Sequence, residues 1–364
     1  MSHKVLVINP GSTSTKIAVY EDDKQVFQKN VEHDAAKIAE FPTIAAQAPY
    51  RAPFVEKALE EQGIDLSTID CIMCRGGMII EPPITSGAYV VDDDLCTALA
   101  SEDLCMAHGS LLGGLIGREF SDKLGKPAYI YDAVTSGSLP PIAKICGYTE
   151  FQRGSTAHVL NGRAQTIKYA ESIGKKPEDL NVVVCHMGGG CSVMAFKHGE
   201  LVDTIGDDEL HMSAERAGGA QLVKFVKLCF SGKYTEKEVQ KLVRGKGGLM
   251  AHLGTSNGKE IEERIEKGDT HAKEVLDAMS YTLCKSIGAL AAIIGEKIDA
   301  IILTGGLAYS KHVSEFITNK VSFLAHVENM AGESEMEALA AGGIRLIEGT
   351  EKAKNYKLPA GYKK

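Results

Sequence analysis

Several features that would place this chain in a membrane, in a secretory pathway or on nucleic acid are absent from its sequence. No apolar run approaches the roughly 18 residues that a membrane-spanning helix requires. The first residues lead directly into a predicted strand, so we expect no signal peptide. The net charge of −8 argues against nucleic acid or an anionic membrane as the main partner. These absences predict a cytoplasmic protein with neither kind of partner.

The cysteines also lack the pattern that disulfides or a zinc site would require. Nine is an odd number for a disulfide framework, and several cysteines, including Cys185 and Cys284, lie in apolar stretches. Cys71 and Cys74 form a CxxC pair, but no second CxxC completes a metal site. We therefore expect reduced thiols that are packed in the core.

The length and composition are those of a globular protein with two domains. The chain has 364 residues, more than the roughly 250–300 at which a single core usually stops growing. Hydrophobic residues make up 44% and charged residues 24%, which is typical of globular proteins. The turn-rich segment TSGSLPP at 135–141 is the expected linker.

Two stretches of the chain repeat one pattern, a β-strand, a turn of glycine and polar residues, and a second strand. The first reads VLVINPGSTSTKIAVY at 5–20, and the second reads VVVCHMGGGCSVMAFK at 182–197. With an offset of 177 residues, Asn9 falls on His186 and Ala18 falls on Ala195. Because glycine lets the backbone of such a turn approach a phosphate, the repeat predicts two facing lobes that hold a polyphosphate between them.

Strands alternate with helices along the rest of the chain, which is typical of an α/β fold. Apolar runs predict further strands at 68–75, 127–133 and 299–304. The remaining apolar periodicity predicts helices at 51–63, 100–124, 156–174, 216–231, 235–244, 257–267, 270–296 and 333–347.

The first turn carries more polar groups than an ordinary hairpin needs. Its polar residues, bracketed by two apolar strands, are Asn9, Ser12, Ser14 and Lys16. The turn is not a Walker A loop, because GxxxxGK[ST] is absent. We expect a phosphate-binding turn between two antiparallel strands, with a simple hairpin turn as the alternative.

Further candidate ligand groups follow buried strands. The glycines at 188–190 and at 305–306 come directly after apolar strands, where backbone N–H groups can bind an anion. Arg75 and Asp132 end two strands of the first half, at the edge where α/β sheets collect ligands. A surface salt bridge is the alternative for either side chain.

Together these residues resemble the short-chain fatty-acid kinases of the acetate kinase group, and within that group the butyrate kinase branch. The opening motif is INPGSTSTK at 8–16, and the second phosphate loop is similar to HMGGG at 186–190. The adenosine loop resembles TGG at 304–306, followed by Leu-Ala-Tyr. ERAG at 215–218 and GESEMEAL at 332–339 extend the resemblance over nearly the whole chain.

The resemblance implies a fold and an activity. The fold would be α/β, the duplicated two-lobe actin-like ATPase (ribonuclease H-like) architecture, with the active site in the interdomain cleft. The N-terminal lobe would comprise 1–134 and approximately 340–364, and the nucleotide-binding lobe 135–339. The activity would be reversible phosphoryl transfer between ATP and a short-chain carboxylate, with Mg²⁺, giving an acyl phosphate and ADP. Because members of the family are usually dimers or larger, a homo-oligomer is expected.

The resemblance also implies roles in phosphoryl transfer for the charged residues and for one histidine. Arg75 and Arg216 match paired arginines that neutralise the carboxylate and the phosphoryl group. Asp132 matches an acid that holds Mg²⁺ or orients the acceptor. His158, which alone would be interpreted as structural, would hydrogen-bond the phosphoryl group. Glu335 would be the second acid near Mg²⁺.

Other family positions would bind the nucleotide or the phosphoryl group in transfer. Glu333 and Glu337 are alternatives to Glu335 as the second acid near Mg²⁺. The positions expected to bind ATP or the transferred group are Asn9, Ser12, Ser14, Lys16, His186, Gly188, Gly189, Gly190, Asn257, Gly305 and Gly306.

Two segments depart from the family pattern. The run DDELHMSAER at 207–216 replaces a segment rich in Pro, Gly and Phe, and it would lie beside the acyl chain. TSNGK at 255–259 stands where the family has an acidic residue for the nucleoside. Two other functions stay open, a sugar or polyol kinase of the same superfamily and a nucleotide-binding module without catalytic activity.

Overall fold

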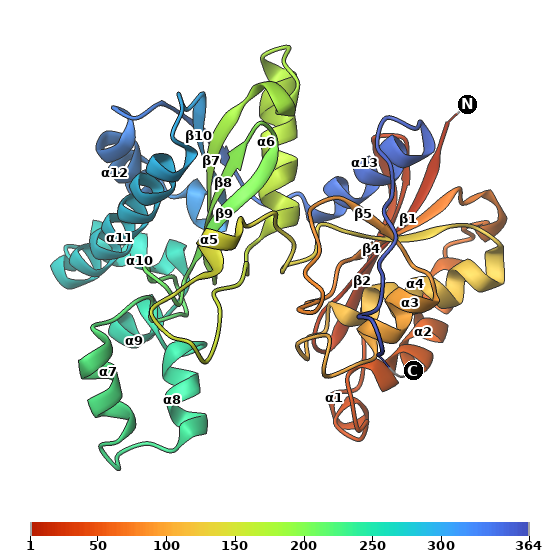
Figure 1. The fold of residues 1–364 in the computed structure, drawn as a ribbon, viewed down its shortest axis with the longest axis horizontal. Helices are drawn as coiled ribbons and strands as arrows, with labels where there is room; N and C mark the ends of the chain where they lie inside the picture. The colour runs from red at the N-terminus through yellow and green to blue at the C-terminus, as the bar shows by residue number, and fades with distance from the viewer. Residues whose placement is uncertain (1, 363–364) are drawn as a thin grey trace. The chain divides into compact units, whose positions relative to one another are not determined.

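The computed structural model of the chain describes residues 2–362. Two units, each with its own sheet and hydrophobic core, make up the chain (Figure 1). Unit 1 comprises Met1–Gly137 and Ser334–Lys364, and unit 2 comprises Ser138–Glu333. Unit 1 is discontinuous in sequence, because the chain leaves it to form unit 2 and then returns. No helix in 2–362 combines the length and the apolar character that crossing a membrane demands.

Unit 1 is built on a six-stranded mixed sheet with the strand order β3-β2-β1-β4-β6-β5. The strands are β1 (Lys4–Pro10), β2 (Ser14–Glu21), β3 (Lys24–Glu32), β4 (Cys71–Arg75), β5 (Ala88–Val90) and β6 (Ala128–Tyr131). β1, β2 and β3 form an antiparallel meander, whereas β4 runs parallel to β1 and β6 runs parallel to β4. Helices cover both faces of the central strands, and for that reason those strands are continuous apolar runs.

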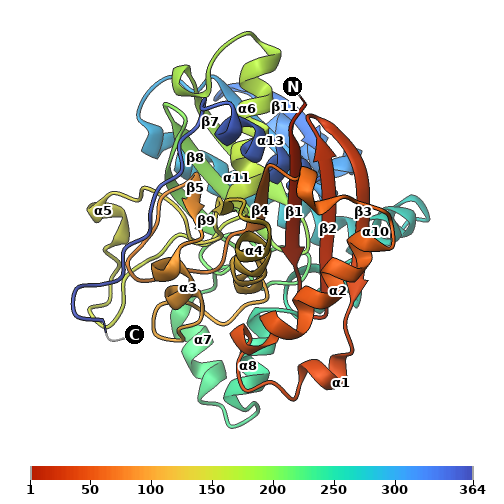
Figure 2. The ribbon, with the colours of Figure 1, turned by 90° about the vertical axis from the view of Figure 1, so that its right-hand side faces the viewer.

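Unit 1 has helices on both faces of this sheet and a short first helix away from it (Figures 1 and 2). They are α1 (Ala35–Ile38), α2 (Ala48–Glu60), α3 (Asp93–Leu99), α4 (Leu111–Leu124) and α13 (Glu335–Ile347). α4 packs on the face of Ile72 and Cys74, and α13 packs on the opposite face. Glycine allows α13 to come close: a Cβ on Gly343 would lie only 2.9 Å from both Met73 Cγ and Val5 Cγ1.

Unit 2 is built on a five-stranded sheet with the order β11-β10-β7-β8-β9. The strands are β7 (Asn181–Met187), β8 (Cys191–Lys197), β9 (Glu200–Gly206), β10 (Ala300–Gly305) and β11 (His326–Ala331). The helices are α5 (Pro141–Lys144), α6 (Val159–Ser172), α7 (Leu222–Cys229), α8 (Glu236–Val243), α9 (Gly248–Leu253), α10 (Gly258–Glu266), α11 (Thr270–Ile294) and α12 (Lys311–Val321). α6 packs on one face of the sheet, while α11 and α12 pack on the other.

The two sheets share one topology, which confirms that the fold is duplicated. Each has an antiparallel meander of three strands, continued by two strands parallel to the first, and unit 1 adds the antiparallel edge strand β5. Val7 pairs with Ala18, and its counterpart Val184 pairs with Met194. The expected match of Ala18 with Ala195 is therefore wrong by one residue, because the second turn is one residue shorter and the offset beyond it is 176 rather than 177.

Smaller details of the strands repeat as well. A register shift lies between Val19 and Tyr20 in unit 1 and between Ala195 and Phe196 in unit 2, the same place at the corrected offset. At the start of β1, the Lys4 N–H donates to Asp70 Oδ2 at 2.8 Å, and at the start of β7 the Asn181 N–H donates to Asp299 Oδ2 at 2.9 Å. Such repeated detail is what an internal duplication leaves.

Several expected helices differ from the structure. The helix expected at 100–124 begins only at Leu111, because Gly109 lies against the first turn: a Cβ there would lie 2.8 Å from Gly11 O. The helix expected at 216–231 begins at Leu222, because Gly218 takes a positive φ of 75° and breaks the run. The elements that sequence reasoning missed are β3, β5, β9, β11, α1, α3, α5, α9 and α12.

Candidate active site

Three predicted residues of unit 1 lie at one edge of its sheet. Asn9, Arg75 and Asp132 stand at the carboxyl ends of β1, β4 and β6, which are adjacent parallel strands. Glu335, the first residue of α13, joins two of them. Its Oε1 accepts a hydrogen bond from Arg75 Nη1 at 2.6 Å, and its Oε2 accepts one from Asn9 Nδ2 at 3.0 Å. The edge therefore carries a cation, two carboxylates and an amide.

Arg75 and Glu335 form a largely buried ion pair, since their side chains are 9% and 23% exposed. A guanidinium has five N–H donors, and the pair uses Nη1. Arg75 therefore keeps donors for an incoming anion, while Glu335 fixes its direction. The carboxylate–guanidinium pair is also the reason why Arg75 tolerates burial.

Asp132 has an uncommon backbone conformation for a non-glycine residue, with a φ of 41°. Its carboxylate is buried, and Oδ1 accepts a hydrogen bond from the Gly87 N–H at 2.7 Å. Left-handed residues directly after a strand are frequent at functional sites, where surrounding structure holds them in place. The conformation turns the chain at the end of β6. This end lies at the same edge of the sheet as Asn9 and Arg75.

The first turn is supported by a residue that the sequence did not reveal. Arg51 in α2 is buried, and its guanidinium donates to Gly11 O at 2.9 Å, to Ser12 O at 2.5 Å and to Ser14 O at 3.2 Å. The carbonyls of the turn are thus drawn to one cation. Of the predicted side chains here, Ser12 and Lys16 are exposed and Ser14 is half-buried.

His33 forms a second buried contact behind this turn. Its Nε2 lies 2.9 Å from Thr15 Oγ1, the residue that follows Ser14 on β2. Burial and the neighbouring Arg51 charge lower the pKa of His33 to about 4. The imidazole is therefore neutral at physiological pH.

The second turn, at 188–190, belongs to unit 2 and is held by the segment 207–216. Gly189 O accepts hydrogen bonds from Ser213 Oγ at 2.8 Å and from the Glu215 N–H at 3.1 Å. Asp207 Oδ2 accepts from Arg216 Nη1 at 2.8 Å. A Cβ on Gly190 would overlap Arg216 Nη1, so the arginine crosses the turn where only glycine fits.

His158 and His186 stack on each other beside the second turn. Their ring centroids are 3.9 Å apart, with an angle of 12° between the planes. His158 Nδ1 lies 2.8 Å from Ser192 Oγ on β8. His186 is 1% exposed, and its Nδ1 lies 2.9 Å from Asn161 Nδ2 on α6. The predicted ligand of the transferred group, His158, is therefore in contact with the histidine of the predicted second phosphate loop.

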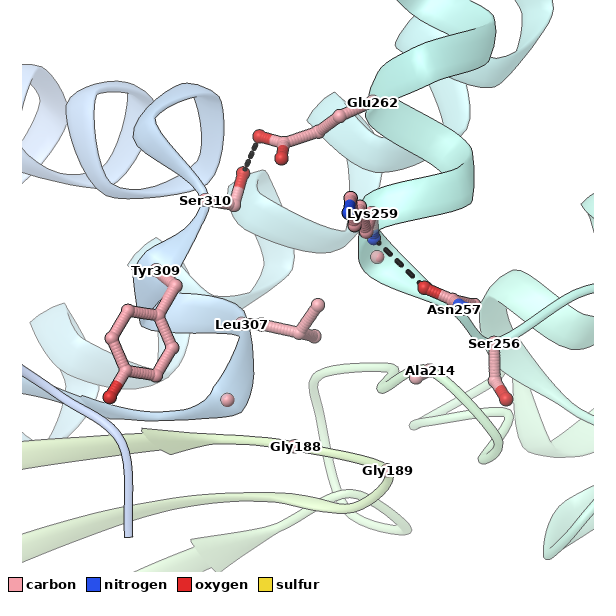
Figure 3. A pocket seen from close by; sticks show the side chains of 12 residues that line it. Gly188, Gly189, Ala214, Ser256, Asn257, Lys259, Glu262, Leu307, Tyr309 and Ser310 are labelled. Carbon is pink, nitrogen blue, oxygen red and sulfur yellow. Dashed lines mark hydrogen bonds between the residues drawn. The ribbon is translucent and has the colours of Figure 1, made fainter.

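A pocket of about 470 Å³ opens next to the second turn in unit 2 (Figure 3). Gly188 and Gly189 form one wall, and the 3₁₀ turn η4 (Gly306–Tyr309) forms another. The remaining lining residues are Ala214, Ser256, Asn257, Gly258, Lys259, Glu262 and Ser310. The size suits a nucleoside, because small-molecule sites commonly enclose about 300–1,000 Å³.

The pocket gives Asn257 and Glu262 distinct environments. Asn257 Oδ1 caps α10, where it accepts hydrogen bonds from the N–H groups of Lys259 and Glu260. Glu262 Oε1 accepts a hydrogen bond from Ser310 Oγ at 2.5 Å (Figure 3). The acidic group that segment 255–259 lacks is thus supplied to the pocket by α10, one turn further along the chain.

The three candidate glutamates have different neighbours in the structure. Glu335 binds Arg75 and Asn9 in unit 1. Glu333 lies in unit 2, with Oε1 3.3 Å from His186 Nε2. Glu337 lies near Tyr20, whose pKa rises to about 12 through burial and, less, through this carboxylate.

The predicted residues thus fall into two clusters, one in each unit. Within 2–362 no three histidine, cysteine or acidic side chains gather as a metal cluster. Mg²⁺ needs no such cluster, because it usually binds one or two carboxylates together with substrate phosphates and water. The carboxylates of Asp132 and Glu335 fit that donor set. The predicted cysteines are confirmed as free thiols, and Cys71, Cys74 and Cys185 are buried.

The residues that sequence reasoning missed mainly support the turns of the site or line its pocket. Arg51, Asn161 and Glu262 lie on helices and reach the turns or the pocket only after folding. Asp207 stands in a run that the sequence had marked as unusual, which was the only available signal for it.

Comparison with known proteins agrees with this geometry. The model of the Acetokinase family matches residues 156–352. "Probable butyrate kinase 2" of Caldanaerobacter subterraneus subsp. tengcongensis is 43% identical over 97% of this chain and 99% of its own length. "Butyrate kinase 1" of Clostridium acetobutylicum is 40% identical over 98% of this chain and 100% of its own length.

Among solved structures, acetate kinase of Porphyromonas gingivalis superimposes with a TM-score of 0.78 at 18% identity, over 95% of this chain and 100% of that chain. That similarity confirms the duplicated, two-lobe actin-like ATPase fold. The sequence identity of 40% or more to these curated relatives, over nearly the full length of the chain, shows the family. The chain belongs to the acetokinase family.

Proposed function

We propose that this protein transfers a phosphoryl group from ATP to a short-chain carboxylate, reversibly and directly, giving an acyl phosphate and ADP. The acceptor is butyrate or a related, including branched-chain, acid. The observation that carries the proposal is the similarity, over nearly the whole chain, to proteins named butyrate kinases. The two clusters described above supply the groups that this reaction needs.

The chemistry calls for charge neutralisation rather than a base. A carboxylic acid with a pKa of about 4–5 is already ionised at neutral pH. The difficulty is to bring this anion against a polyphosphate, so catalysis rests on positioning and electrostatics. Arg75 and Arg216 perform this task, because a planar guanidinium binds carboxylate and phosphoryl oxygens through paired donors. Their acidic partners, Glu335 and Asp207, hold each guanidinium in place.

Unit 2 binds the nucleotide in this proposal. The nucleoside occupies the pocket between the second turn and η4, with Glu262 available to the ribose hydroxyls. The backbone N–H groups of Gly188–Gly190 bind phosphate oxygens, since glycine turns after a strand suit anions. His158, at the start of α6, and His186, on β7, face the phosphates.

Unit 1 binds the acceptor and the phosphoryl group in transfer. Asn9, Ser12, Ser14 and Lys16 of the first turn hydrogen-bond the phosphoryl oxygens. Asp132 orients the acceptor or takes part in the metal site. Asp132 and Glu335 would hold Mg²⁺, which would supply neutralisation of charge on the phosphates.

The strongest alternative is a kinase with an alcohol acceptor, which would need a general base. In that case Asp132→Asn would abolish turnover, and Arg75→Ala would matter much less. We expect the reverse order of losses for a carboxylate acceptor. Nothing specific in the site favours the alternative, nor a binding module without catalytic activity.

We also propose that the protein is a homo-oligomer. Its support is a row of exposed apolar side chains on α7 and at its C-cap, among them Val223 on the helix at 71% exposure and the C-cap residue Phe230 at 86%. Light scattering coupled to size-exclusion chromatography measures the mass directly. A monomer at micromolar concentration contradicts this assignment.

The proposed reaction is tested by trapping the acyl phosphate with hydroxylamine. The purified protein is incubated with ATP, Mg²⁺ and one acid at a time, from acetate to valerate, with isobutyrate and phenylacetate. We expect a clear optimum among the short-chain acids. If no acid gives a hydroxamate, the proposed function is refuted.

A further inference from the structure

A chain of buried polar groups lies behind His186 in unit 2. Asn161 on α6, His186 on β7 and Thr304 on β10 are each at most 1% exposed. Asn161 Nδ2 lies 2.9 Å from His186 Nδ1 and 3.2 Å from Thr304 Oγ1. Thr304 Oγ1 lies 2.9 Å from Gly332 O. The groups therefore form one continuous hydrogen-bonded series.

The direction of every bond in this series follows from its far end. Gly332 O can only accept, so the hydroxyl proton of Thr304 points to it. The Thr304 oxygen must then accept from Asn161, which identifies the amide nitrogen as the atom that faces it. The second N–H of that nitrogen is donated to His186 Nδ1.

Two further contacts agree with this direction. Gln165 Nε2 donates to Asn161 Oδ1 at 3.4 Å, so the amide oxygen also has a partner in the same orientation. Because Nδ1 of His186 accepts a hydrogen bond, it carries no proton, and the neutral ring is protonated at Nε2. The outer shell of the site thus selects one tautomer of the histidine.

The Nε2–H of His186 is turned toward the second turn. A Cβ on Gly188 would lie 3.4 Å from it. Glu333 Oε1 lies 3.3 Å away, yet Nε2 has no hydrogen-bond partner among residues 2–362. A buried donor without a partner is costly, so this N–H is poised for a ligand that is absent from the chain itself.

We propose that Asn161 is a positioning residue, which keeps His186 in the Nε2–H tautomer so that the imidazole donates to a phosphate oxygen at Gly188–Gly190. The inference rests on the proposed function for the identity of the ligand, a nucleotide phosphate. His186 then acts as a neutral donor and not as a base. A neutral ring also suits the stacking of His158 at 3.9 Å, where two imidazolium rings would repel each other.

The tautomer is tested by NMR on the full chain labelled with ¹⁵N-histidine. Two-bond ¹H–¹⁵N correlations distinguish a protonated from an unprotonated ring nitrogen, and the His186→Gln variant assigns the signals. We expect Nε2 to be protonated and Nδ1 to be unprotonated. The ¹⁵N chemical shifts of both nitrogens should change when MgADP is added. A proton on Nδ1 in the unliganded protein overturns the inference.

Variants separate a positioning role from a merely structural one. Asn161→Asp replaces the donor by an acceptor, so we expect Nδ1 of His186 to carry a proton and its NMR signal to change from that of an unprotonated to that of a protonated nitrogen. Thr304→Val breaks the series, while Thr304→Ser keeps it. Thr166→Val is the matched control, because Thr166 is equally buried on α6 and its hydroxyl bonds only to Gly162 O among the contacts described.

Kinetics of the same variants complete the test. We expect Thr304→Val to lower kcat about tenfold, the effect of losing one oriented hydrogen bond, with KM for the acid unchanged. Thr304→Ser and Thr166→Val should stay within about twofold of the wild type. Equal kinetics and equal NMR spectra for Thr304→Val and Thr166→Val refute the inference. If the wild-type protein forms no acyl phosphate at all, the proposed function fails, whereas the tautomer result stands or falls separately.

Discussion

Arg51 offers the sharpest test of how the first turn is built. Its guanidinium donates four hydrogen bonds, three to the carbonyls of Gly11, Ser12 and Ser14 and one to Gln47 Oε1 at 2.7 Å. Burial lowers the pKa of Arg51, so its charge is held at a desolvation cost that the carbonyls offset. Arg51→Met keeps much of the side-chain volume and removes all four donors.

The expected loss follows from those bonds. A single hydrogen bond to a charged group contributes about 1.5–3 kcal/mol net to stability, and the bonds of one buried guanidinium are not additive. Methionine relieves that desolvation but leaves carbonyls without partners, so we expect the free energy of unfolding to fall by roughly 2–4 kcal/mol. We also expect kcat to fall about 100-fold, the effect of a shift of about 1 Å in a positioned group.

The assays separate the turn from the fold as a whole. Urea unfolding measures stability and hydroxamate trapping measures kcat. Calorimetry measures the affinity for ADP, which the proposed function assigns to unit 2 and which should therefore not change. Arg51→Lys should recover part of kcat, because an ammonium can reach one or two of the carbonyls. Arg118→Met is the control, an arginine of unit 1 that pairs with Asp93 and Asp122 at the surface. A folded Arg51→Met protein with wild-type kcat refutes the reasoning.

Three further predictions concern other parts of the molecule. Gly190→Ala should lower kcat at least about tenfold, because the new Cβ overlaps Arg216 Nη1, while Gly147→Ala, in open space, should retain activity; equal hydroxamate rates for both would contradict this. The buried Cys71 and Cys74, whose pKa burial raises, should react with a disulfide reagent only after unfolding, and their labelling in the native protein would show that the core opens. The pKa of His33 is lowered from 6.5 to about 4 in the folded protein. Between these two pH values the unfolded chain therefore binds a proton at His33, whereas the folded chain does not. The free energy of unfolding should therefore be highest above about pH 6.5 and fall as the pH drops toward 4, and a His33→Gln variant with the same decrease in urea titrations would exclude this cause.

From the sequence alone, we predicted the strands that are continuous apolar segments. β1, β2, β7, β8 and β10 were predicted because both faces of these strands are covered and nearly every residue is buried. β3 and β11 were missed because they are edge strands with few buried residues and no clear alternation. Local pattern cannot register an element whose position depends on its neighbours.

The candidate site was predictable only where motif residues follow strands. Arg75 and Asp132 were found because strand ends mark the ligand edge of such a sheet, and Asn9 was found because its turn is unusually polar. Arg51 and Asn161 were not found, since each reaches its partner across helices and strands that are distant in sequence. The length of the second turn was also misjudged, because a glycine run aligns equally well with one residue more or fewer.

The discontinuity of unit 1 has a consequence for biosynthesis. The ribosome delivers β1–β6 early, but α13, which covers Val5 and Met73, is made only after all of unit 2. One face of the first sheet therefore stays apolar and uncovered while almost 200 residues are translated, which takes about 10–40 s at synthesis rates of roughly 5–20 residues per second. Unit 2 is contiguous and can fold meanwhile, so the nascent chain is expected to depend on chaperones through its N-terminal strands.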